Sequence, residues 1–94
     1  MSLEEVRGKI DAIDTRIVEL LGARQQLVFQ AATYKRNPDE VRAPKRREQM
    51  MARLHDLSLE HGVEPTVVER VYTAMIDEFI ELEQRRHQSL TATD

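Results

Sequence analysis

The first third of the chain carries apolar residues at alternating steps of three and four, and this heptad pattern constrains the fold more than any other feature. The pattern predicts one helix from about Leu3 to Lys35, roughly 50 Å long at ~1.5 Å per residue. A chain of 94 residues cannot bury so long a helix by itself. We therefore expect a partner chain to complete the core. The pattern consists of Leu3, Val6, Ile10, Ile13, Ile17, Leu20, Leu27 and Ala31.

Prolines and a glycine divide the rest of the chain into one loop and two shorter helices. Two prolines disfavour helix at the residues before them, so we expect a loop over residues 36–44. A second helix is predicted over about 45–61, where the following glycine is a stop signal. A third helix is predicted from a first-turn proline over about 65–87. We expect residues 88–94 to form a polar tail.

The composition fits a helical protein and argues against several functional classes. Charged residues make up 33% of the chain and aromatic residues 4%, which favours helices over strands. A net charge of −3 disfavours nucleic acid as a partner, and the absence of cysteine excludes disulfides and a thiol nucleophile. Because no long apolar run or signal-like start is present, we expect a cytoplasmic protein that does not bind membranes. We expect a single all-α domain over residues 1–94, ordered over about 3–87.

One position of the heptad pattern is occupied by a cation. Arg24 stands between Leu20 and Leu27, where an unpaired buried charge is costly. An isolated arginine of this kind could extend to solvent or pair with an acidic neighbour. Lys35, however, lies eleven residues further on nearly the same face and begins a positively charged stretch. The pattern favours a cationic pocket between helices. The basic residues of this stretch are Lys35, Arg36, Arg42, Lys45, Arg46 and Arg47.

Two further charged residues bear on such a pocket. Glu83 follows Phe79 by four on the inward face of the third helix, and it could either pair with Arg86 or face the pocket. Arg7 is ~25 Å from Arg24 along the first helix, so one small ligand cannot contact both in the same chain. If two long helices pair antiparallel, Arg7 of one chain could meet Arg24 of the other. The symmetry of such a dimer would create two pockets.

The pocket's charges are not accompanied by a motif for covalent, metal or nucleotide chemistry. His55, His61 and His87 lack metal-ligand spacing, and glycine-rich phosphate loops are absent. Preplaced cations without a nucleophile or metal suit a small dicarboxylate that reacts intramolecularly. Such cations stabilise the charge that develops on a substrate oxygen in the transition state.

The inward cations lie in four segments of characteristic spacing, namely Val6–Asp14, Glu19–Arg24, Lys35 and Val41–Arg46. Together these segments resemble the all-helical class of chorismate mutases, and the resemblance covers about residues 3–86. It implies an intertwined homodimer of three-helix chains. It also implies a concerted rearrangement of chorismate to prephenate, a step of aromatic amino acid biosynthesis, with neither cofactor nor metal.

The resemblance assigns roles to the matched residues. Arg24 and the partner's Arg7 would hold the two carboxylates of the substrate, and Lys35 would bind the ether oxygen and a carboxylate. Arg46 matches a pocket arginine near the start of the second helix. Glu83 matches a glutamine or glutamate that donates a hydrogen bond to the ether oxygen. A carboxyl group donates only when protonated, so the resemblance predicts activity that falls as the pH rises.

One position departs from the family's pattern. Arg47 stands where typical mutases carry a glutamate that binds the ring hydroxyl, and Glu48 could serve if the register shifted by one residue. The related isochorismate pyruvate lyases of salicylate synthesis also lack that glutamate, and their loop resembles residues 43–46. Chorismate mutase is the favoured prediction, with the lyase and a mutase of 4-amino-4-deoxychorismate as alternatives. A non-catalytic helical dimerisation or regulatory module is the alternative from another class.

Overall fold

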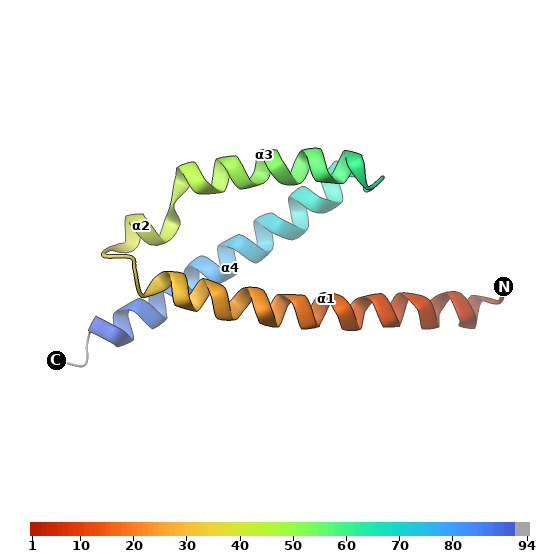
Figure 1. The fold of residues 1–94 in the computed structure, drawn as a ribbon, viewed down its shortest axis with the longest axis horizontal. Coiled ribbons are helices and arrows are strands. Elements are labelled where there is room, and N and C mark those ends of the chain that lie inside the picture. Colours follow the sequence, from red (N-terminus) through yellow and green to blue (C-terminus); the bar gives the residue numbers. More distant parts are fainter. Residues whose placement is uncertain (92–94) are drawn as a thin grey trace.

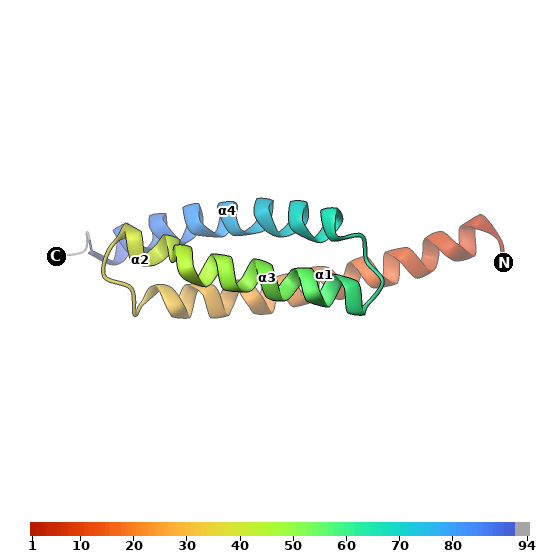
Figure 2. The same ribbon diagram turned by 90° about the horizontal axis from the view of Figure 1, so that it is seen from above.

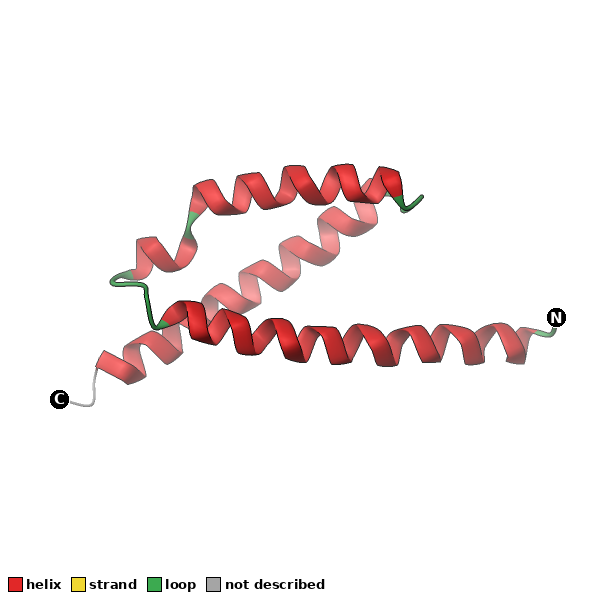
Figure 3. Ribbon diagram, viewed as in Figure 1, coloured by secondary structure: helices red, strands yellow, loops and turns green. Residues whose placement is uncertain are grey.

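Helices account for nearly all of the chain in the computed structural model, which describes residues 1–91 without the side chains of His87 and of residues 89–91. In chain order they are α1 (Leu3–Ala32), α2 (Pro38–Arg42), α3 (Pro44–Glu60) and α4 (Pro65–Thr91), as Figure 1 shows. The described range contains no strand (Figure 3). The prediction of an all-α fold is confirmed. Within the same range, no helix is both long enough and apolar enough to cross a membrane.

The long helix α1 has a well-defined start and ends slightly earlier than expected. The Ser2 side chain caps it by accepting a hydrogen bond from the backbone N–H of Glu5 at 3.2 Å. Its end was predicted near Lys35, but α1 ends at Ala32. There the chain tightens into i to i+3 hydrogen bonds, in which the N–H of Lys35 donates to the carbonyl of Ala32 at 3.2 Å. Lys35 therefore follows the helix instead of belonging to it.

The segment predicted as a loop contains the short helix α2. Asn37 caps this helix, because its side-chain oxygen accepts a hydrogen bond from the backbone N–H of Glu40 at 3.0 Å. Pro38 occupies the first turn, where its missing N–H costs nothing. The prediction of a loop over residues 36–44 is wrong for Pro38–Arg42, because it treated this proline only as a helix breaker. Ala43, at a φ of 41°, then turns the chain, and Pro44 begins α3 one residue earlier than predicted.

The last helix extends beyond its predicted end. After Pro65 the sequence contains neither glycine nor proline, so no stop signal interrupts α4 before Thr91. The prediction of a polar tail is therefore wrong for residues 88–91, which are helical. Residues 92–94, the rest of that predicted tail, lie outside the described residues.

The helix α4 organises the packing, because it contacts α1, α2 and α3. The turn between α3 and α4 contains Gly62 with a φ of 68°, a conformation that glycine adopts without strain. Figure 2 shows α3 beside α4, and α4 also packs against α1. The most buried apolar residues come from all four helices, so one small core joins them. They are Ala32, Val41, Leu54 and Ile76.

The N-terminal half of α1 projects beyond the other helices (Figures 1 and 2). It carries the first part of the heptad pattern, and those apolar side chains remain exposed; Ile13, for example, is 59% exposed. Contiguous exposed apolar surface of this kind marks an interaction site. We call these residues the α1 seam: Leu3, Val6, Ile10, Ile13, Ile17 and Leu20.

Candidate active site

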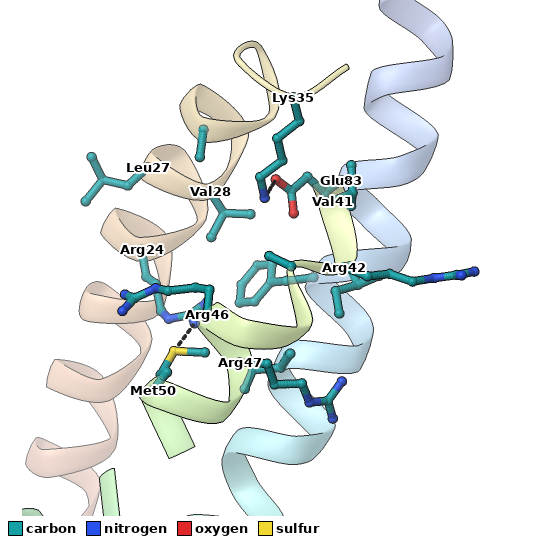
Figure 4. A pocket seen from close by; sticks show the side chains of 15 residues that line it. Arg24, Leu27, Val28, Lys35, Val41, Arg42, Arg46, Arg47, Met50 and Glu83 are labelled. Carbon is teal, nitrogen blue, oxygen red and sulfur yellow. Dashed lines mark hydrogen bonds and ion pairs between the residues drawn. The ribbon is translucent and has the colours of Figure 1, made fainter. Parts of the chain in front are cut away.

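A partly open pocket of about 300 Å³ lies between the C-terminal half of α1, the α2 segment, the start of α3 and the C-terminal half of α4 (Figure 4). Its volume suits a small ligand. Apolar side chains such as Val28, Ile76 and Phe79 form part of its wall. Its charged residues are mostly cationic. They are Arg24, Lys35, Arg42, Arg46, Arg47 and Glu83.

Arg24 brings a partly buried positive charge to the pocket. One of its terminal nitrogens, Nη2, lies 3.8 Å from the sulfur of Met50, and the guanidinium lies over the ring of Phe79 at 5.2 Å. The other terminal nitrogen, Nη1, is buried and has no hydrogen-bond partner among the described residues. A buried donor without a partner is costly, and an anion or another acceptor from outside the chain would satisfy it.

Lys35 and Glu83 form an ion pair across the pocket. The Lys35 Nζ donates to Oε1 of Glu83 at 2.5 Å, and the two side chains are 23% and 4% exposed, respectively. Lys35 comes from the turn after α1, and Glu83 comes from α4. Arg86, the alternative partner considered for Glu83, instead lies over the ring of Phe29 at 4.5 Å. Glu83 is thus a pocket residue, and its carboxyl group faces an ammonium.

The arginines of the α2–α3 region point in different directions. Arg46 extends toward Arg24 in Figure 4, which places two guanidinium groups on one side of the pocket. Arg42 belongs to the pocket lining, but its side chain extends away from the pocket (Figure 4). Arg47 turns toward α4, where its Nη1 donates to Oδ1 of Asp77 at 2.8 Å. The pocket therefore presents Arg24 and Arg46 on one side and the Lys35–Glu83 pair on another.

Asp77 is a residue of this region that the sequence prediction missed. Its carboxylate neutralises a cation at the pocket edge, although Asp77 itself is exposed and does not line the pocket. A signal for the contact does exist in the sequence. Arg47 and Asp77 are equally far from Gly62, so an antiparallel pair of helices around that turn brings them side by side.

Two predicted site residues lie outside the pocket. Arg7 is exposed on the projecting half of α1 and does not line the pocket of its own chain. Its predicted role requires a partner chain, because ~25 Å of helix separates Arg7 from Arg24 in the same chain. Glu48 is exposed and also outside the lining, because it is rotated by ~100° around α3 from Arg47. Within this chain, the position expected to bind a ring hydroxyl is therefore occupied by Arg47.

The pocket offers positive charge and hydrogen-bond donors to a ligand. Guanidinium groups bind carboxylates with paired hydrogen bonds, so a small molecule with two carboxylates fits its chemistry. Among the described residues, no group of three or more histidine, aspartate or glutamate side chains lies close enough together to hold a metal ion. The arrangement suits the binding and polarisation of a compact dianion.

Comparison with known families adds an independent finding. The family model described as chorismate mutase type II matches residues 6–84. The match begins in the projecting part of α1 and ends one residue after Glu83, so it includes every residue that lines the pocket. No individual curated protein matches the chain.

Proposed function

Because the chain belongs to the chorismate mutase type II family, we propose that it rearranges chorismate to prephenate in the pocket between α1, α3 and α4. The observation that carries this proposal is the buried Nη1 of Arg24, which has no partner among the described residues of a predominantly cationic pocket. A substrate carboxylate would supply the missing acceptor. A non-catalytic module gains nothing from such an unpaired inward charge.

The proposed reaction takes place within one substrate molecule. A carbon–carbon bond forms while the ether carbon–oxygen bond breaks, and no proton or electron is exchanged with the protein. Arg24 and the partner's Arg7 hold the two carboxylates and thereby fix the reactive conformation, which removes an entropic barrier. Lys35 stabilises the negative charge that develops on the ether oxygen. The Lys35 ammonium lies 2.5 Å from Glu83. With substrate bound, it must therefore contact both Glu83 and the ether oxygen.

The proposal includes an intertwined homodimer in which the α1 seam of one chain packs against a second copy. Two observations support it. The seam is exposed in the single chain, and Arg7 is separated from Arg24 by ~25 Å of helix. An antiparallel pairing of the two α1 helices would cover the seam. It would also bring the partner's Arg7 to Arg24, in two symmetry-related pockets.

Product identification tests the proposed function. The purified chain is incubated separately with chorismate and with isochorismate, and the products are identified by chromatography and mass. We expect prephenate from chorismate. Salicylate and pyruvate from isochorismate, without prephenate from chorismate, would overturn the mutase proposal in favour of the lyase. The absence of product from both compounds and from 4-amino-4-deoxychorismate would favour the non-catalytic module.

Two substitutions test the proposed role of Glu83. If this side chain donates a hydrogen bond to the ether oxygen, Glu83→Gln keeps a donor at that place and Glu83→Ala removes it. We therefore expect Glu83→Gln to retain most of the wild-type kcat/KM and Glu83→Ala to lose about tenfold or more. Glu81→Ala, two residues away and exposed, is the control and should keep the wild-type value. A wild-type kcat/KM in Glu83→Ala contradicts the role.

A further inference from the structure

The apolar face of α1 does not end with the α1 seam but continues to the wall of the pocket. Leu27 follows Leu20 by seven residues, so both side chains lie on the same face of the helix. Leu27 also lines the pocket, and it is 63% exposed. In Figure 4 its side chain points away from α4. At Leu27, the wall of the pocket is therefore an apolar surface that is open to solvent.

Arg24 lies between Leu20 and Leu27 in the heptad pattern, but its charge does not lie on the outer face of α1. The guanidinium lies over the ring of Phe79 at 5.2 Å, and its Nη2 is 3.8 Å from the sulfur of Met50. Because Phe79 and Met50 belong to α4 and α3, the charge is directed into the pocket. Apolar packing along the seam can thus continue past Arg24 as far as Leu27.

The heptad spacing determines how two antiparallel copies of α1 can pair. In one register, each of the apolar residues from Leu3 to Leu27 lies opposite a residue of the partner's pattern. This register also places the partner's Arg7 beside Arg24, as the proposed function requires. Its layers pair Leu3 with the partner's Leu27, Val6 with the partner's Arg24, Ile10 with the partner's Leu20, and Ile13 with the partner's Ile17.

The two registers shifted by one heptad each leave one end of the pattern uncovered. A shift in one direction places Leu27 beyond the start of the partner's α1. A shift in the other direction places Leu3 opposite the partner's Tyr34, which follows the end of the partner's α1. Leu3 and Leu27 are both 63% exposed in the single chain. The register that pairs them therefore removes the most apolar surface from water.

We propose that Leu3 of one chain packs on the partner's Leu27 and closes the pocket on that side. The inference rests on the proposed function, since it adds a second partner residue, after Arg7, to the same site. Within one chain, Leu3 and Leu27 lie ~36 Å apart along α1, so only a second copy can make this contact. The closure excludes water, which strengthens the interactions between the cations of the pocket and the substrate.

Disulfide cross-linking tests the contact without any need for activity. The chain contains no cysteine, so Leu3→Cys combined with Leu27→Cys introduces two thiols and no others. We expect mild oxidation to convert this double variant into a covalent dimer on a non-reducing gel. The matched control combines Leu3→Cys with Leu20→Cys, reports the register shifted by one heptad, and should remain monomeric on the gel. A test variant that does not cross-link, or a control that cross-links equally well, overturns the proposal.

Mixed dimers test whether Leu3 acts on the neighbouring pocket. Co-refolding Arg7→Ala with Arg24→Ala gives mixed dimers with one complete pocket, which takes Arg24 from the first chain and Arg7 from the second. Leu3→Ala added to the Arg24→Ala chain changes the wall of this complete pocket. Leu3→Ala added instead to the Arg7→Ala chain changes only the incomplete pocket. The dimer interface loses one leucine in both arrangements, so each is the control for the other.

The kcat/KM for chorismate should be lower by about fivefold or more when Leu3→Ala lies in the Arg24→Ala chain than when it lies in the Arg7→Ala chain. Equal values would show that Leu3 contributes only to the interface, and would overturn the closure of the pocket. An active wild type together with an inactive mixture of Arg7→Ala and Arg24→Ala also overturns it. If wild type does not convert chorismate, the proposed function fails, and the cross-linking result alone decides whether Leu3 reaches the partner's pocket.

Discussion

Arg24→Ala should lower kcat/KM for chorismate by about a thousandfold or more while the protein remains folded and dimeric. The expected loss is large because one terminal nitrogen of the guanidinium is buried without a partner among the described residues and can bind a substrate carboxylate. Stability should be unchanged or higher, since the substitution removes an unpaired inward charge. Initial rates measure the loss of kcat/KM. Gel filtration measures the dimer, and thermal unfolding followed by circular dichroism measures the stability.

The matched control for Arg24→Ala is Arg16→Ala on the same helix. Arg16 is exposed and makes only a surface contact with Glu19 at 3.7 Å, so its removal should leave activity intact. A fully active Arg24→Ala would contradict the proposed pocket.

A complementation experiment tests whether each pocket takes Arg24 from one chain and Arg7 from the other. Arg7→Ala should be inactive by itself, and co-refolding equal amounts of Arg7→Ala and Arg24→Ala should restore about a quarter of wild-type activity. Half of the dimers are then mixed, and each mixed dimer contains one complete pocket.

Ile17→Glu in the α1 seam should produce a monomer and remove most of the activity. Ile17 is half exposed in the single chain, so its burial depends on the second copy. Each substitution removes about 1.5–3 kcal/mol of apolar burial and adds the cost of a buried carboxylate, and both chains of a symmetric dimer carry it. The dimer Kd should therefore rise by several orders of magnitude. Light scattering after gel filtration, over a range of protein concentrations, measures the change.

The control for the seam adds the same charge on the opposite face of α1. Thr15 is exposed, and it lies about half a turn around the helix from the seam. Thr15→Glu should leave both the dimer and the activity intact. If Ile17→Glu remains a fully active dimer, the seam is not the interface, and the proposed contribution of Arg7 to the pocket fails with it.

The helices could be predicted because their apolar residues recur at helical spacing, which depends only on the sequence. The errors arose where one sequence signal is compatible with two different structures. Pro38 was treated as a breaker, yet after Asn37 it begins α2. The end of α4 was placed too early because a polar run was equated with a tail, whereas the helix lacks a stop signal up to Thr91.

The candidate site could be predicted only in part, for a related reason. Arg24, Lys35 and Glu83 were found because a charge on an otherwise apolar face is visible in the sequence. The ion pairs were not found, since they depend on how the helices are aligned with one another. The Lys35–Glu83 contact needs the packing of α1 on α4, and the contact of Arg47 with Asp77 needs the register of α3 on α4.

The projecting half of α1 carries both the exposed seam and Arg7. In the proposed dimer, the same stretch of helix forms the interface and supplies a residue that binds the substrate. A substitution there can therefore affect both dimerisation and activity. A substitution that loosens the seam also withdraws an arginine from the neighbouring pocket. Over evolutionary time, this stretch would not drift toward a weaker interface while catalysis is under selection. Selection for catalysis would therefore also preserve the dimer interface.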